Sequence, residues 1–123
     1  MKIEFRQEYK FEKLMVWQKS VELSIDIHQM TRSWPKEELY SLTSQITRAS
    51  DSVSLNIAEG STGMSNAEFR KFLGYSWRSA LEVINCLYLA MGRELIDQTQ
   101  FDEKYDYVTE LVKMIFGLRN LLK

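Results

Sequence analysis

Apolar residues recur every three or four positions through most of the chain, which is the period of an amphipathic α-helix. Few residues interrupt this pattern, because the chain contains one proline and five glycines. The pattern predicts four long helices, over residues 11–32, 36–59, 66–94 and 100–122. The short connections between them favour an antiparallel, up-down-up-down four-helix bundle. We therefore expect an all-α fold with one domain over residues 11–122, preceded by an N-terminal arm over residues 1–10.

The breaks between the predicted helices contain residues that commonly start or end helices. Pro35 suits the first turn of a helix. Ser65 and Glu68 have the spacing of a capping box, which predicts a helix start near residue 66. Gly60 and Gly63 lie in the break before that start.

Three of the four predicted helices carry more apolar positions than one bundle core needs. On the first helix, one stripe holds Leu14, Trp17, Val21, Ile25 and His28, and a second holds Val16, Leu23, Ile27 and Met30. The third helix adds a stripe of Trp77, Leu81 and Tyr88, and the fourth adds Tyr107, Leu111, Met114, Leu118 and Leu121. Large exposed apolar patches usually mark interfaces. We therefore expect self-association, and the pattern leaves open which stripe faces the core and which faces a neighbouring subunit.

The second predicted helix combines small residues with a polar stripe. Small side chains between Ser41 and Ala58 let a neighbouring backbone approach closely, so we expect this helix to be the most tightly packed. The polar stripe beside its apolar face comprises Gln45, Arg48, Ser52, Asn56 and Glu59. A carboxylate in the last turn opposes the helix dipole, so Glu59 needs a partner, with Arg78 or a neighbouring chain's Arg48 as candidates. We favour a buried polar network that fixes helix register or oligomer geometry over a ligand site.

The overall charge gives no support for strong nucleic-acid binding. Sixteen lysines and arginines against seventeen aspartates and glutamates give a net charge of −1 and a pI near 5.9. A dedicated nucleic-acid-binding domain usually carries a basic excess, so such a role here needs a local patch.

Two local patches are candidates for such a surface. On the third helix Arg70, Lys71, Tyr75 and Arg78 recur at helical spacing beside Trp77. Cations can follow a phosphate backbone while an exposed ring stacks on a base. A second group near the end of the fourth helix contains Lys113, Arg119 and Lys123. The first group taken alone fits a solvated outer face, with Tyr75 covering a neighbour, better than a binding surface. The second group is the weaker candidate, because basic residues at the end of a helix also suit the helix dipole.

No arrangement of residues in the sequence points to catalysis. His28 is the only histidine, and its place on an apolar stripe favours a buried, hydrogen-bonded side chain over a catalyst or metal ligand. Cys86 is the only cysteine, which excludes an intramolecular disulfide and a cysteine metal cluster within one chain. No cation adjacent in sequence lowers its pKa. We therefore expect no enzymatic activity, no catalytic or metal site and no cofactor.

Targeting signals are also missing from the sequence pattern. The first ten residues lack the apolar core of a signal peptide. No apolar run approaches the ~18–20 residues of a membrane span. We expect a cytoplasmic protein with no membrane partner.

Several motifs in the chain are similar to those of a known family. They are Trp34-Pro35-x-x-Glu38, Leu42-Thr43-x-Gln45-Ile46-x-Arg48-Ala49-x-x-Ser52 and Asn56-Ile57-Ala58-Glu59-Gly60, supported by Phe11-x-x-Leu14-x-Val16-Trp17 and Phe69-x-x-Phe72-Leu73. Together they resemble the signature of the 23S rRNA intervening-sequence protein family. These bacterial proteins are also called four-helix-bundle proteins and sometimes carry a ribosomal-protein label. The resemblance spans about residues 11–122.

The resemblance implies an antiparallel four-helix bundle that assembles as a ring-like homopentamer without enzymatic activity. Family members are encoded within insertions in large-subunit rRNA genes or stand alone in bacterial genomes. A related branch, the accessory proteins of diversity-generating retroelements, binds reverse transcriptase and nucleic acid through a basic surface. This chain departs from that branch in its acidic pI. It also has Arg78-Ser79 where the family often has Gly-Ser, so that Arg78 either adds a surface cation or disturbs a close contact.

Two functions remain open from the sequence. The first is a non-enzymatic oligomeric protein that binds RNA or a ribonucleoprotein through the patch on the third helix. The second is a protein–protein scaffold or adaptor with no nucleic-acid role.

Overall fold

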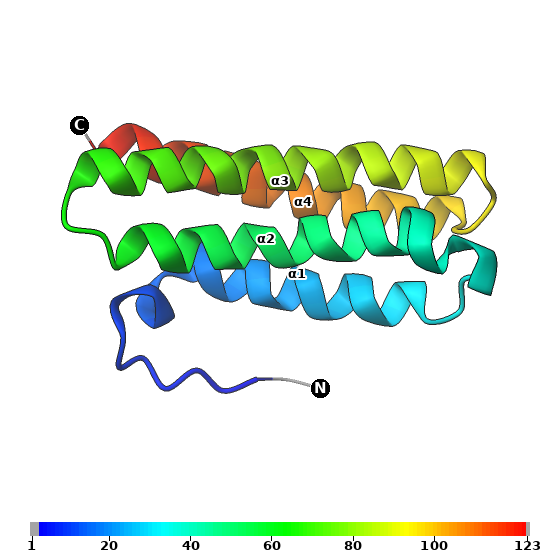
Figure 1. Ribbon diagram of the computed structural model, residues 1–123, viewed down its shortest axis with the longest axis horizontal. Helices are drawn as coiled ribbons and strands as arrows, with labels where there is room; N and C mark the ends of the chain where they lie inside the picture. The colour runs from blue at the N-terminus through cyan, green and yellow to red at the C-terminus, as the bar shows by residue number, and fades with distance from the viewer. Residues whose placement is uncertain (1–2, 123) are drawn as a thin grey trace.

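The computed structural model describes residues 3–122, which form a bundle of four long helices (Figure 1). The helices are α1 (Met15–Thr31), α2 (Ser44–Ser61), α3 (Asn66–Gly92) and α4 (Gln98–Leu121). Shorter helical turns precede the first two: η1 (Lys10–Lys13) before α1, and η2 (Lys36–Glu38) and η3 (Leu39–Thr43) before α2. The described residues contain no strand, so the prediction of an all-α four-helix bundle is confirmed.

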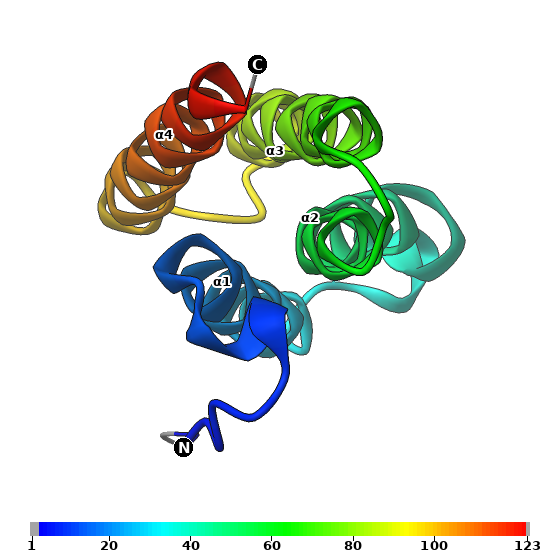
Figure 2. The same cartoon turned by 90° about the vertical axis from the view of Figure 1, so that its left-hand side faces the viewer.

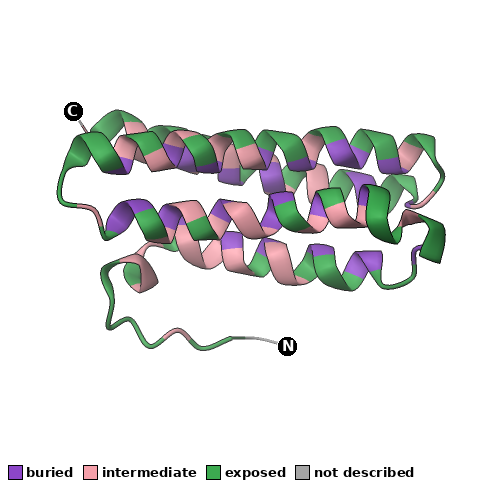
Figure 3. Cartoon of the chain, viewed as in Figure 1, coloured by how far each residue is buried: buried purple, intermediate pink, exposed green. Residues whose placement is uncertain are grey.

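The helices are arranged in chain order around a common core (Figure 2). Each helix packs against the next, and α4 packs back against α1. Every helix contributes fully buried residues, such as Leu23, Ile57, Leu73 and Leu111. In Figure 3 buried segments alternate with exposed ones along each helix, as expected of helices with one face toward the core. Among residues 3–122, every helix is too short or too polar to span a lipid bilayer.

The helix boundaries differ from the predicted ones mainly before α2. Instead of one helix from residue 36, the chain forms the 3₁₀ turn η2 and then the π-helical turn η3. The backbone of Ser41 in η3 is not helical, with φ −124° and ψ −109°. This break accompanies the burial of both Trp34 and Leu42 at the end of the bundle. The start of α3 agrees with the sequence, because the Glu68 N–H donates to Ser65 Oγ at 3.1 Å.

The two apolar stripes of α1 have different environments. The buried stripe contains Val16, Leu23, Ile27 and Met30, whereas Leu14, Trp17, Val21 and Ile25 are only half-buried. The N-terminal arm runs along the outer side of α1 (Figures 1 and 2), where the Phe5 ring packs edge-on against Trp17 at 5.4 Å between centroids. Part of the apolar surplus of α1 is therefore covered by the chain's own arm.

The contact between α2 and α3 is close, as the small residues of α2 predict. Gly60 is buried beside α3, and a Cβ atom at that position would lie 2.6 Å from Phe72 Cβ. Further along the same contact, the buried Ser76 hydroxyl donates to the Val53 carbonyl at 2.8 Å. A serine side chain is short, so its hydroxyl reaches the backbone of a neighbouring helix only where the two helices lie close together.

Candidate binding surfaces

His28 is exposed, so the prediction of a buried histidine is wrong. Its Nε2 lies 3.0 Å from Asp51 Oδ1, and the Ser24 hydroxyl donates to the same carboxylate oxygen. The reason is the orientation of α1, which places Leu23 and Ile27 in the core and turns His28 toward α2 and solvent. Sequence reasoning missed Ser24 and Asp51, although Ser24 lies one helical turn before His28.

Ser24, His28 and Asp51 are the residue types of a hydrolytic triad, but their connectivity is different. In a triad the serine hydroxyl bonds to the histidine ring, and the carboxylate holds the other ring nitrogen. Here Ser24 and His28 both bond to Asp51 Oδ1, so the hydroxyl proton is directed at the carboxylate. This arrangement connects α1 to α2 and does not activate the serine.

Two further ionisable groups, Cys86 and Tyr107, have packing roles. Burial raises the pKa of the Cys86 thiol to about 11, with a further contribution from the negative charge of Glu82. A protonated thiol is a poor nucleophile and a poor metal ligand. The Tyr107 hydroxyl donates to the Lys19 carbonyl at 2.8 Å, and burial raises the pKa of Tyr107 to about 12. Residues 3–122 contain no cluster of three or more His, Cys, Asp or Glu side chains suited to a metal ion.

The polar stripe of α2 forms hydrogen bonds at the surface of the chain. Gln45 Nε2 donates to Glu82 Oε2 at 2.8 Å, which joins α2 to α3. Ser79 Oγ donates to Ser52 Oγ at 3.0 Å, and Asn56 Nδ2 donates to both oxygens of Ser52 at 2.9 Å. These bonds lie along the line where α2 and α3 meet.

The prediction that this polar stripe is buried is wrong for the single chain. Ser52 and Asn56 are half-buried, but Gln45, Arg48 and Glu59 are exposed. Arg48 Nε bonds to the Ser44 carbonyl of its own helix at 3.3 Å. Within the described residues Glu59 has no side-chain partner, so neither Arg48 nor Arg78 of the same chain pairs with it. The remaining member of the signature, Gly60, is buried against α3.

Two of the predicted nucleic-acid-binding residues, Arg70 and Arg119, have a structural role. Arg70 Nη1 donates to the carbonyls of Arg119 and Leu122 at 2.7 and 2.9 Å. Arg119 Nε donates back to the Arg70 carbonyl at 3.3 Å. The last turn of a helix leaves carbonyls without intrahelical partners. The Arg70–Arg119 pair therefore caps α4 and fixes its end against α3.

The remaining residues of the third-helix patch lie at the surface. Lys71, Tyr75 and Arg78 are exposed on the outer face of α3. The Tyr75 ring packs edge-on against Phe72, and Lys71 Nζ lies 5.4 Å from the Phe72 ring centroid. Arg78 is therefore a surface cation and does not disturb a close contact.

The second basic group is less compact than the sequence suggested. Lys113 is exposed on α4, whereas Arg119 is held by Arg70. Lys123 lies outside the described residues.

An apolar ridge runs along the outer side of the α3–α4 contact. It consists of Trp77, Leu81 and Tyr88 of α3 with Tyr105 and Phe116 of α4. Leu81, Tyr88 and Phe116 are 39%, 57% and 47% exposed. Trp77 contacts Phe116, and Tyr88 contacts Tyr105, at centroid distances of 6.2 and 6.3 Å. Of the predicted second stripe of α4, Leu111 instead belongs to the core, and Tyr107, Met114 and Leu118 pack half-buried against it.

Comparisons with known proteins agree with this fold. The sequence model of a family described as 23S rRNA-intervening sequence protein matches residues 12–117. The chain is similar to a crystal structure from Bacteroides thetaiotaomicron VPI-5482, described as a protein with unknown function from the S23 ribosomal protein family. That similarity has a TM-score of 0.80 and 25% sequence identity, and covers 85% of this chain and 95% of the other. No curated protein matches the chain.

Proposed function

Because the chain belongs to the 23S rRNA-intervening sequence protein family, we propose that it is a non-enzymatic, self-assembling protein that binds RNA or a ribonucleoprotein through α3. We also infer that the protein acts in the cytoplasm. Its nucleic-acid surface is the group of Lys71, Tyr75 and Arg78, which replaces the larger patch expected from the sequence.

The observation that supports the proposal is that both cations of this group are exposed and without an ion-pair partner in the described chain. Lys71 and Arg78 are exposed and have no ion-pair partner within residues 3–122. Tyr75 lies between them on the same helix face with 43% of its surface exposed. Free cations neutralise phosphates, and an exposed ring stacks on an unpaired base. Repetition of the group in an oligomer offsets the weakness of a single site, because several copies bind one RNA at once.

Neutralising both cations should weaken RNA binding and reduce its dependence on salt. We expect Lys71→Gln/Arg78→Gln to lower the slope of log affinity against log salt by about 0.7 for each lost phosphate contact on single-stranded RNA. Fluorescence anisotropy with a labelled single-stranded RNA, measured over a range of salt concentrations, reports both affinity and slope.

The control for this experiment is Lys13→Gln, which removes an exposed cation from η1 instead of α3. It should bind RNA as the unaltered protein does. Affinity that is unaffected by the double substitution, or binding that is independent of salt, would contradict the proposal. Absence of RNA binding together with one stoichiometric protein partner after nuclease treatment would favour the scaffold function instead.

Self-assembly is supported by the α3–α4 apolar ridge. The arm covers part of the surplus on α1, but no described segment covers the ridge residues Leu81 and Phe116. Burying such a patch between subunits removes apolar surface from water, at about 25 cal/mol per Å². The family resemblance suggests a ring of five copies.

Introducing charges into the ridge should dissociate the assembly. We expect the unaltered protein to be an oligomer and Leu81→Glu/Phe116→Glu to approach the monomer mass of 14.5 kDa. Both side chains are partly exposed, so the helical content should be retained. Size-exclusion chromatography with light scattering measures the mass, and far-UV circular dichroism measures the helix content.

Met64→Glu is a suitable control, because Met64 is almost fully exposed in the α2–α3 connection. It should leave the mass unchanged. An unaltered protein that elutes as a monomer would refute self-assembly, and a folded double variant of unchanged mass would exclude the ridge as the interface.

A further inference from the structure

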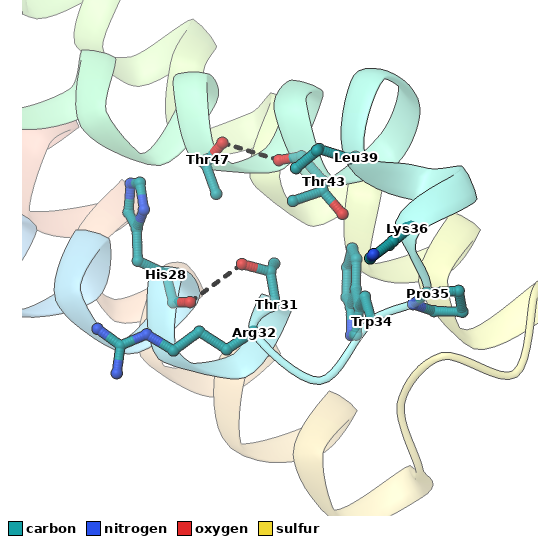
Figure 4. A pocket seen from close by; sticks show the side chains of 9 residues that line it. All are labelled: His28, Thr31, Arg32, Trp34, Pro35, Lys36, Leu39, Thr43 and Thr47. Atoms are coloured by element: carbon teal, nitrogen blue, oxygen red, sulfur yellow. Dashed lines mark hydrogen bonds between the residues drawn. The ribbon is translucent and has the colours of Figure 1, made fainter.

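The outer face of α2 is turned away from the rest of the chain. α2 lies at a corner of the bundle, with α1 on one side and α3 on the other (Figure 2). On the α1 side, Thr47 and His28 line a pocket that the two helices share (Figure 4). On the α3 side, the Ser79 hydroxyl donates to Ser52 Oγ at 3.0 Å. The third side of α2 therefore remains for contacts with another molecule.

Exposed side chains follow one line along this outer face. Arg48, Leu55 and Glu59 are exposed, and the half-buried Ser52 lies between the first two. Successive spacings of four, three and four residues keep all of them on the same side of the helix. Arg48 and Glu59 lie three helical turns apart, which is roughly 16 Å at a rise of 1.5 Å per residue.

The charges at the two ends of this line are unpaired. Within residues 3–122 neither Arg48 nor Glu59 forms an ion pair. Glu82 of α3 lines the same pocket as Arg48, but its carboxylate accepts from Gln45 Nε2 at 2.8 Å. Arg48 Nε donates to the Ser44 carbonyl of its own helix. The line therefore carries a positive charge at one end and a negative charge at the other, each available to a partner.

The middle of the line is apolar. Leu55 is 66% exposed and lies close to the midpoint between Arg48 and Glu59. A single exposed leucine is common on protein surfaces and by itself indicates nothing. Here its neighbour on the line is the small Ser52, which lets a second helix approach closely. The order of positive, apolar and negative groups is complementary to the same order read in the opposite direction.

We propose that two copies of this chain pack with their α2 helices antiparallel across a two-fold axis near Leu55. Arg48 of each copy then lies opposite Glu59 of the other, so that two ion pairs flank a contact between the two Leu55 side chains. A two-fold contact uses the same surface on both copies, which this order of residues permits. A parallel arrangement would instead place like charges opposite each other.

This contact goes beyond the proposed function, because it lies on α2 and not on the α3–α4 apolar ridge. Four positions on one helix are few compared with the about 20–30 residues that each side of a standard interface contributes. A single pair is therefore weak and leaves the ridge variant close to the monomer mass. Between two assemblies that the ridge holds together, several α2 faces pair at once, which strengthens the contact.

Disulfide trapping in the full chain tests the arrangement, because a covalent bond retains a weak contact. Identical positions of two copies meet only near a two-fold axis, so Leu55→Cys should form a covalent dimer in oxidised glutathione. The native Cys86 is 1% exposed and does not take part. The control Glu110→Cys, exposed on α4, should cross-link about tenfold more slowly, because no contact raises its effective concentration. Non-reducing gel electrophoresis measures both rates.

Charge exchange tests the two ion pairs. In the Leu55→Cys protein, Arg48→Glu should slow cross-linking about fivefold, because two exposed ion pairs are replaced by pairs of like charge. Adding Glu59→Arg to the same chain should restore the rate, since opposite charges again face each other. Arg48 and Glu59 are exposed, so circular dichroism should show unchanged helix content in each variant.

The proposal would be overturned if Leu55→Cys cross-linked no faster than Glu110→Cys. An effect of Arg48→Glu that Glu59→Arg does not reverse would show that the two residues do not face each other. The mass of the unaltered protein and of the ridge variant tests self-assembly through the ridge separately, so a failure of either proposal leaves the other intact.

Discussion

Replacement of Gly60 by alanine should destabilise the protein by about 2–3 kcal/mol, a large effect for one added methyl group. The new Cβ would lie 2.6 Å from Phe72 Cβ and 3.0 Å from Phe69 Cδ1. Phe72 Cβ is attached directly to the α3 backbone, so rotation of the side chain cannot relieve the clash. The two helices must separate locally, which weakens the packing of the buried residues on both sides of their contact.

Gly117→Ala is the matched control for this prediction. Gly117 lies in α4, and a Cβ there would meet nothing within 4 Å. Alanine is a better helix former than glycine, so this variant should be more stable by about 0.5–1 kcal/mol.

Urea unfolding of both variants, followed by circular dichroism at one fixed protein concentration, measures the two changes. The fixed concentration matters because assembly adds to apparent stability. A Gly60→Ala protein as stable as Gly117→Ala would show that α2 and α3 are not in close contact at this position.

The close approach at Gly60 also gives a physical reason for part of the family motif Asn56-Ile57-Ala58-Glu59-Gly60. Ile57 is fully buried in the core, and Asn56 bonds back to Ser52 on the preceding turn. Glu59 is different, because it is exposed and has no partner within residues 3–122. Most of this motif is therefore explained by packing within one chain, and Glu59 is the member whose role lies at the surface.

The helices could be predicted from the sequence because their signals are local. Apolar spacing, the scarcity of helix breakers and the Ser65 N-cap depend on residues within one or two turns, although only the Glu68 N–H to Ser65 Oγ half of the predicted capping box forms. The error before α2 has a different origin, since the break at Ser41 accompanies the burial of Trp34 and Leu42 against other elements. Local pattern alone contains no information about that burial.

The environment of His28 could not be predicted for a similar reason. Both stripes of α1 are apolar, and periodicity gives their angular separation but not which one faces the core. The half-buried stripe is partly covered by Phe5 of the arm, a contact that helix periodicity does not describe. The bond to Asp51 joins residues 23 positions apart and comes from the packing of α1 on α2.

The basic patch shows the same limit at Arg70. Its spacing from Lys71, Tyr75 and Arg78 predicted one surface, but its guanidinium caps a helix end 49 residues away. Only the folded arrangement separates a cation that holds the structure together from one that is free to bind.

Replacement of Arg70 by methionine should destabilise the protein by about 1.5–3 kcal/mol. Methionine retains much of the aliphatic side chain but cannot donate to the Arg119 and Leu122 carbonyls. Hydrogen bonds from a charged donor contribute more than neutral ones, and the two carbonyls at the end of α4 lose their partner. Urea unfolding measures the loss, and hydrogen exchange should locate it in the last turn of α4.

Lys71→Met is the matched control, because it removes a neighbouring cation that is exposed and makes no such hydrogen bond. Its unfolding free energy should change by less than about 0.5 kcal/mol. The two variants should therefore have opposite effects. Arg70→Met lowers the free energy of unfolding and leaves the salt dependence of RNA binding unchanged. Lys71→Met leaves the free energy of unfolding unchanged and removes part of that salt dependence. If Arg70→Met instead leaves stability unchanged and reduces the salt slope, then Arg70 contacts phosphate and the cap at the end of α4 does not hold that arginine in solution.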